Sequence, residues 1–199
     1  AMLEQAGVRL VGPVAKAGYD LDAAAVLLCE ADGTEEEVAA DIERMTTLLR
    51  ASGATRIQVS QTEAERLRFW AGRKNAFPAA GRAAPAYYCM DGTIPRRRLG
   101  EMLTAIREME QRHGLRCPNV FHAGDGNLHP LILFDDGDPD SVRRATEFGI
   151  EILEHSVRLG GSITGEHGVG VEKIDQMCTQ FDAPTRELFL AIKRAFDPA

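Results

Sequence analysis

Apolar side chains recur at the three- and four-residue spacing of an amphipathic helix in five parts of the chain. Each part begins with a helix-capping residue or a proline; the first two begin at Thr34 and Thr62. We expect helices over residues 34–53, 62–73, 95–114, 138–161 and from 182 onward. In the last of these, Leu188 and Ile192 are predicted to face the core.

Strand patterns lie between these helices. Short apolar or alternating runs predict strands at residues 21–31, 56–60, 87–94, 120–121 and 131–134. The last two runs flank Asp125-Gly126, a dipeptide typical of a two-residue hairpin loop. Because strands alternate with helices but one hairpin is contiguous, the predicted fold class is α+β, an antiparallel or mixed sheet with helices packed on one face.

Length and composition fit one domain. The 199 residues are 44% apolar, which is enough to bury a full core, and we assign residues 21–199 to this domain. Residues 1–20 carry little pattern and are expected to form a lead-in. A formal charge of −7 argues against nucleic acid as a partner, and no run approaches the roughly 18 apolar residues of a transmembrane span.

The cysteines indicate a reducing compartment. They are Cys29, Cys89, Cys117 and Cys178, and none belongs to a Cys-x-x-Cys pair. We interpret them as reduced and mostly buried, and no secretory signal is visible, so the predicted location is cytoplasmic. Cys89 is interpreted as a core residue of its strand.

The ionisable chemistry is concentrated in two glycine-rich stretches. In the first, a two-residue loop at Asp125-Gly126 would pair His122 with His129, with Cβ atoms roughly 4.5–5.5 Å apart. Two imidazoles placed in this way can converge on one cation. A transition-metal ion wants three or four ligands, and Glu166, in the second stretch Gly160–Gly170, is the natural third.

His167 follows Glu166, and its imidazole is suited to act as a general base near neutral pH. Two histidines, one carboxylate and an open position are typical of a catalytic metal site. This ligand set suits Zn²⁺, Mn²⁺ or Fe²⁺ almost equally. The alternative from the residues alone is that the histidines serve hydrogen bonding or packing, and that the glycines serve turns.

Three stretches carry a family resemblance. His122–His129 and Gly161–Lys173 resemble the two signatures of the C-terminal domain of FAD-linked oxidases, a family that includes D-lactate dehydrogenases, D-2-hydroxyglutarate dehydrogenase and glycolate oxidase. Trp70–Arg82, followed by Tyr87–Arg96, is most similar to the FAD-binding large subunit of the glycolate-oxidising members. The resemblance covers the chain from about Leu27 onward.

The resemblance implies a ferredoxin-like cap domain whose site residues have distinct roles. Arg73 would bind the substrate carboxylate, and Asn127 would contact flavin or substrate. The divalent metal would lie on the two hairpin histidines and Glu166, with His167 as the catalytic base. FAD would be held chiefly by an N-terminal domain that this chain lacks, and residues 1–20 would lead in from that domain.

The implied reaction is oxidation of a small 2-hydroxy acid, most simply glycolate to glyoxylate, with hydride transfer to FAD. D-Lactate and D-2-hydroxyglutarate are alternative substrates; Phe77 stands where a polar residue could bind a second carboxylate, which favours a small acid. The implied partners are the FAD domain and other glycolate oxidase subunits, which would hold the protein peripherally at the inner face of the membrane. A further alternative is a non-catalytic module that docks partner subunits through the hairpin and Arg96–Arg98.

Overall fold

The strands and helices follow one another along most of the chain in the computed structural model, which describes residues 1–198. The strands are β1 (Met2–Glu4), β2 (Ala25–Leu27), β3 (Ala86–Cys89), β4 (Gly92–Thr93), β5 (Val120–Phe121), β6 (Asn127–Leu128) and β7 (Leu131–Phe134). The helices are α1 (Gln5–Ala15), α2 (Glu35–Ala51), α3 (Glu63–Lys74), α4 (Ala76–Ala83), α5 (Leu99–His113), α6 (Pro139–Arg158), α7 (Met177–Gln180) and α8 (Ala183–Phe196). A 3-10 turn, η1 (Arg96–Arg98), directly precedes α5.

All strand pairs are antiparallel. They form three small sheets in the orders β2-β1-β5, β3-β7 and β4-β6. A single bridge from Asn119 to Pro130 connects the segment before β5 to the segment before β7, and a bridge from Thr93 to Ser162 brings the second glycine-rich stretch to the end of β4. The prediction of an α+β fold is therefore confirmed, in its antiparallel form.

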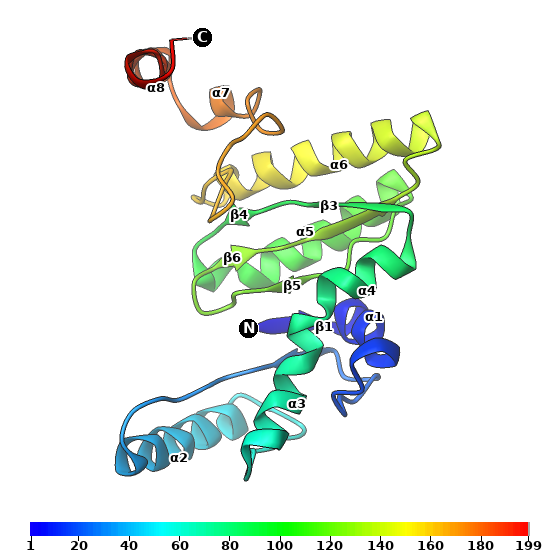
Figure 1. Ribbon diagram of the computed structural model, residues 1–199, viewed down its shortest axis with the longest axis vertical. Helices are drawn as coiled ribbons and strands as arrows, with labels where there is room; N and C mark the ends of the chain where they lie inside the picture. The colour runs from blue at the N-terminus through cyan, green and yellow to red at the C-terminus, as the bar shows by residue number, and fades with distance from the viewer. Residues whose placement is uncertain (199) are drawn as a thin grey trace.

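The main core lies between these strands and two long helices, α5 and α6, which pack against each other, and α6 also contacts β7 and β4 (Figure 1). Large side chains from both layers are fully buried there: Met102, Ile106, Phe121, Leu128, Ile132, Phe148 and Ile152. Burying a side chain of this size stabilises the fold by roughly 1.5–3 kcal/mol relative to its exposed state. This layer therefore provides a firm base for the hairpin.

The first twenty residues are part of the folded structure. The pattern predicts a lead-in there, but β1 pairs with β2 on one side and with β5 on the other. Leu3, Val8 and Val11 are fully buried in a second core that includes Val120 of β5. Short strands and a short helix that contains Pro13 give weak sequence patterns, so the periodicity does not reveal their tertiary contacts.

Two predicted strands differ from the structure. Residues 56–60 form no strand, because their alternating side chains meet no partner strand. The strand predicted over Tyr87–Ile94 is split at Met90–Asp91 into β3 and β4, which pair with β7 and β6 respectively. Asp91, at the break, is fully buried.

The helices α2 and α8 lie at opposite ends of the molecule (Figure 1). The capping box at Thr34 is present, but no residue of α2 is fully buried. Leu188 and Ile192 of α8 are 59% and 50% exposed, so the prediction that they face the core is wrong. Amphipathic spacing shows which side chains share a helix face, and says nothing about what covers that face. None of the described helices is long and apolar enough to cross a membrane.

Candidate metal and substrate site

The first glycine-rich stretch forms a hairpin with a longer loop than predicted. The His122 N–H donates to the Asn127 carbonyl at 3.0 Å, and the His122 carbonyl accepts from the Gly126 N–H at 3.1 Å. Gly126 alone in the loop has a positive φ, 74°, whereas a type I′ loop of two residues needs a positive φ at both. The loop is therefore Ala123–Gly126, and the predicted pairing of His122 with His129 is wrong.

The two hairpin histidines nevertheless share a face. His129 lies two residues beyond Asn127, which is the partner of His122, and side chains two residues apart point to the same side of a strand. The His122 and His129 ring centres are 5.3 Å apart. The prediction that two imidazoles converge on one side of the hairpin is confirmed in a different register.

Glu166 brings a carboxylate to these rings. Its Oε1 is 2.9 Å from Nε2 of His129 and 3.9 Å from Nε2 of His122. His129 is 1% exposed, while the His122 and Glu166 side chains are 40% and 52% exposed, so the cluster opens to solvent on one side. Burial lowers the pKa of the His129 imidazole and favours the neutral ring, the form that binds a metal ion.

These three residues fit a divalent cation. Their ligand atoms lie within 4.8 Å of one another, and two nitrogens with one carboxylate oxygen are a usual donor set for such ions. The Nδ1 atom of His129 is buried and has no hydrogen-bond partner in the part of the chain described. The solvent side of the cluster leaves room for a substrate ligand.

The segment that carries Glu166 is held by Asp91, which no sequence pattern above indicates. The Asp91 carboxylate accepts hydrogen bonds from the N–H groups of Gly165, Glu166 and His167 at 2.8–3.1 Å. The Thr164 hydroxyl donates to the same carboxylate at 2.9 Å. Successive N–H groups around one anion form a concave anion-binding nest. Asp91 thereby fixes the backbone from which the Glu166 and His167 side chains project.

The charge of Asp91 is balanced inside the fold. Lys173 Nζ lies 3.6 Å from the Asp91 carboxylate and donates to the Asp91 carbonyl oxygen at 3.0 Å. Burial alone would raise the pKa of the Asp91 carboxyl, but the N–H donors of the loop outweigh it and hold the pKa below its usual value. A buried acid must have partners, so an Asp inside a strand pattern is the signal that could have identified it.

Arg73 lies at the end of α3 and reaches the cluster. Its Nη2 is 3.2 Å from Nε2 of His122, and its Nε is buried without a partner among the residues described. Gly72 lies against the ring of Tyr19, which a Cβ at that position would overlap. The Tyr19 hydroxyl also donates to the Phe69 carbonyl. Tyr19 therefore fixes how α3 is turned, and with it the direction of Arg73.

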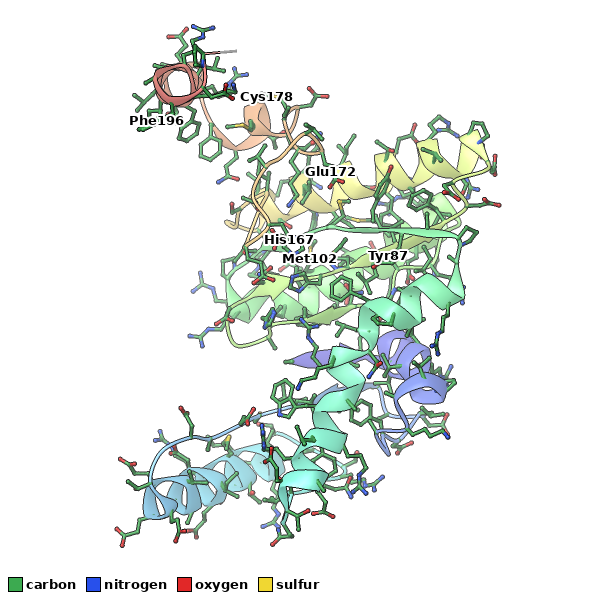
Figure 2. All side chains as sticks on the ribbon, in the orientation of Figure 1. Tyr87, Met102, His167, Glu172, Cys178 and Phe196 are labelled. Atoms are coloured by element: carbon green, nitrogen blue, oxygen red, sulfur yellow. The ribbon has the colours of Figure 1, made fainter. Side chains whose placement is uncertain are left out.

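His167 and Asn127 complete the set of predicted site residues. His167 is 44% exposed, and its Nε2 lies 3.7 Å from Glu166 Oε1 (Figure 2). Asn127 is buried in β6 rather than exposed at the hairpin tip, and its Oδ1 lies against Gly165. That oxygen has no hydrogen-bond partner among the residues described. The structure thus brings Arg73 and His167 to the ligand cluster and places Asn127 beneath the loop.

A known protein family matches nearly the whole chain, including every residue of the candidate site. The family of FAD linked oxidases, C-terminal domain, matches residues 2–199. The chain belongs to this family. The match includes β1 and α1, which pack into the domain in the structure.

Curated relatives of this FAD-linked oxidase domain carry names of hydroxy-acid enzymes. The glycolate oxidase subunit GlcD of Escherichia coli (strain K12) is 55% identical over 99% of the chain, and GlcD of Bacillus subtilis (strain 168) is 35% identical over 98%. A D-lactate dehydrogenase of Anaerostipes hadrus is 28% identical over 87%. The chain spans 40%, 42% and 37% of the lengths of these three relatives.

A solved structure shares the fold of this FAD-linked oxidase domain. It is p-cresol methylhydroxylase with substrate bound, at a TM-score of 0.62 and 15% sequence identity. The match covers 99% of this chain and 44% of that one. At this identity the likeness concerns the fold alone.

Proposed function

We propose that the chain is the substrate- and metal-binding part of an FAD-dependent 2-hydroxy acid oxidoreductase that converts glycolate to glyoxylate. The observation that carries this proposal is the convergence of Arg73 with the ligand cluster of His122, His129 and Glu166. A guanidinium suits the carboxylate of a 2-hydroxy acid, and a metal ion on the neighbouring ligand cluster would suit its α-hydroxyl. The 55% identity to a glycolate oxidase subunit supports glycolate as the acid.

The chain's residues bind and orient the acid. Arg73 donates two parallel hydrogen bonds to the substrate carboxylate, because its planar guanidinium matches that group. His122, His129 and Glu166 would hold a divalent cation, Zn²⁺, Mn²⁺ or Fe²⁺, which would supply Lewis-acid chemistry that lowers the pKa of the α-hydroxyl. The open side of the cluster receives the hydroxyl and one carboxylate oxygen.

His167 accepts the α-hydroxyl proton. Its ring centre is 5.3 Å from that of His129, and it stands on the solvent-facing side of the cluster, where a substrate enters. FAD would be held by a domain outside this chain and would supply the acceptor for the hydride of Cα. Asn127 is the candidate contact to flavin or substrate, supported by its unpartnered Oδ1.

The wall of the site favours a short acid. The Phe77 ring is 6.3 Å from the His129 ring in an edge-on arrangement. An aromatic wall provides no partner for a second carboxylate, which disfavours D-2-hydroxyglutarate. D-Lactate is the second candidate because D-lactate dehydrogenases are among the relatives, at 26–28% identity over most of the chain and at 34% over 55% of it.

The likeness to a glycolate oxidase subunit also suggests assembly. We infer that the chain works with an FAD-binding domain and with partner subunits, in the cytoplasm or peripherally at the inner face of the membrane. The alternative role, docking without catalysis through Arg96–Arg98, has less support. Arg98 is engaged by Glu101 at 2.6 Å, and this role leaves the Arg73 cluster unexplained.

Metal content and glycolate binding test the proposal. Elemental analysis of the chain loaded with Mn²⁺ is expected to give about one ion per chain, lost in His122→Ala and in Glu166→Ala. Calorimetry is expected to show glycolate binding to the loaded chain weakened about 10- to 100-fold by Arg73→Ala, since a charged hydrogen bond is lost. Arg82→Ala is the matched control, because Arg82 is exposed and outside the cluster. A folded chain that takes up no metal would contradict the proposal.

A further inference from the structure

A second set of metal-ligand atoms shares His129 with the site described above. The Sγ atom of Cys89 and one nitrogen from each of His129 and His167 lie within 4.8 Å of one another. The pairing of β3 with β7 sets Cys89 opposite Leu131, two residues beyond His129. Residues two apart point to the same side of a strand, so Cys89 and His129 face the same space.

We propose that Cys89, His129 and His167 form a second metal-binding site, whose softer ligand set takes a thiophilic divalent cation such as Zn²⁺ or Cd²⁺. Sulfur and imidazole nitrogen are the ligands that this class of ion prefers, whereas the carboxylate of Glu166 also suits harder ions. In a tetrahedral site with the usual bond lengths, ligand atoms are roughly 3.5 Å apart. His167, exposed and on a loop, makes the remaining approach of about an ångström by side-chain rotation.

The buried ring of His129 gives independent support for a ligand at this place. His129 is 1% exposed, and its Nδ1 has no hydrogen-bond partner in the part of the chain described. Its Nε2 already faces Glu166. A buried imidazole with one nitrogen satisfied and the other unpaired is costly unless something binds it. A cation bound through Nδ1 would remove that cost and leave Nε2 facing Glu166.

Cys89 supplies the sulfur as a free thiol. A cysteine thiol is mostly protonated near neutral pH, so the Cys89 sulfur carries a proton when no cation is present. When the cation binds, the S–H bond breaks and a sulfur–metal bond forms. The proton leaves to water, and neither the sulfur nor the metal changes oxidation state.

A cation bound at this second site has a consequence for catalysis. His167 as a ligand no longer accepts the α-hydroxyl proton, so a thiophilic cation inhibits the oxidation of the hydroxy acid. This consequence rests on the proposed function, whereas the binding itself does not. The binding is therefore tested without any measurement of activity.

The test uses the whole chain with Cys29 and Cys178 replaced by serine, because both are exposed thiols that would otherwise take up Cd²⁺ adventitiously. Cys178 lies toward the α8 end of the molecule, away from His167 (Figure 2). Cd²⁺ is added to the metal-free protein, and the ultraviolet charge-transfer absorption of the Cd–thiolate bond is recorded. We expect about one Cd²⁺ per chain with this absorption.

Three variants in that background decide the outcome. Cys89→Ser is expected to abolish the absorption, and His167→Ala to weaken Cd²⁺ binding by at least about tenfold. Glu166→Gln, which breaks the other ligand set, is expected to keep the absorption. Circular dichroism shows that each variant is folded. Absorption that persists in folded Cys89→Ser, or unchanged Cd²⁺ affinity in folded His167→Ala, overturns the proposal; loss of metal in His122→Ala concerns only the proposed function.

Discussion

The two glycine-rich stretches meet at one site, but different interactions hold them in place. The hairpin of residues 119–129 is built from backbone hydrogen bonds between near neighbours, and carboxyl groups of Glu4 and Glu110 receive the Asn119 and Cys117 N–H groups at its base. The loop of residues 160–170 depends on Asp91, which lies 74 to 76 residues earlier than the N–H groups it binds. One stretch is shaped locally, and the other is shaped by a distant anion.

The carboxyl groups that support the two stretches are Asp91 for the loop, and Glu4 and Glu110 for the hairpin. They differ in the direction of their pKa shifts as well as in their distance along the chain. Burial raises the pKa of the Glu4 and Glu110 carboxyls, which have few donors around them. Burial acts on Asp91 in the same direction, but the N–H donors of the loop outweigh it and lower the pKa. The number of aligned donors, rather than burial alone, decides the direction in which the pKa of each acid shifts. The surroundings of Asp91 therefore favour a negative charge, whereas those of Glu4 and Glu110 favour the protonated carboxyl.

Removal of that charge is expected to have the largest effect. Asp91→Asn takes the anion from the loop N–H groups and leaves Lys173 without its partner. Breaking a buried ion pair in this way costs about 3–5 kcal/mol of the free energy of unfolding. Chemical denaturation measures this loss, and elemental analysis is expected to show that the variant no longer retains metal at Glu166.

The double variant Asp91→Asn/Lys173→Met separates the effect of the unpaired Lys173 charge from the effect of the lost support for the loop backbone. Removing the unpaired ammonium is expected to recover much of the free energy of unfolding, because the uncompensated charge is gone. Metal binding is not expected to return, since the loop N–H groups still lack the negative charge and the second acceptor oxygen of the carboxylate. Full metal retention in Asp91→Asn would show that the loop holds its own shape.

A smaller effect is expected in the hairpin. Gly126→Ala places a Cβ on the Ile94 carbonyl oxygen at a φ of 74°, and the expected loss is about 2 kcal/mol of the free energy of unfolding. Gly124→Ala in the same loop is the matched control, since its Cβ meets nothing within 4 Å. Thermal denaturation is expected to show little change for Gly124→Ala, within about 0.5 kcal/mol. Equal losses in both variants would argue against the loop geometry.

The smallest expected effect concerns pH. The folded chain keeps protons on Glu4 and Glu110 at pH values where the unfolded chain has lost them. The free energy of unfolding therefore falls as the pH rises from the ordinary carboxyl value of 4.5 through the raised pKa values. Glu110→Gln, which still accepts the Cys117 N–H, is expected to reduce this fall; melting temperatures over a pH series measure it. An unchanged pH dependence would show that Glu110 is not the group responsible.

Local features of this fold could be predicted from the sequence, and features that depend on distant contacts could not. The caps at Thr34, Thr62 and Asp138 act within one helical turn, and all are present. The two hairpin histidines share a face because strand alternation alone requires it. Their register depends on the backbone of Gly126 against Ile94, which no local pattern encodes.

The residues of the candidate site show the same division between features that the sequence predicts and features that depend on distant contacts. His122, His129, Glu166, Arg73 and His167 carry recognisable chemistry, and the structure brings them together. Asp91 looked like a residue of one long strand, because the break between β3 and β4 depends on two different partner strands. The apolar stripe of α8 likewise predicted burial, but the described part of the chain provides no layer to cover it.

The contact between Tyr19 and Gly72 affects how firmly the site can hold a carboxylate. In the proposed function, Arg73 and the ligand cluster bind neighbouring groups of one small molecule, so the guanidinium has to stand at a fixed distance from the cluster. Tyr19 fixes the rotation of α3 and hence the position of the guanidinium. A smaller residue at position 19 would let α3 settle differently and weaken the hold on the carboxylate, although Tyr19 does not contact the acid itself.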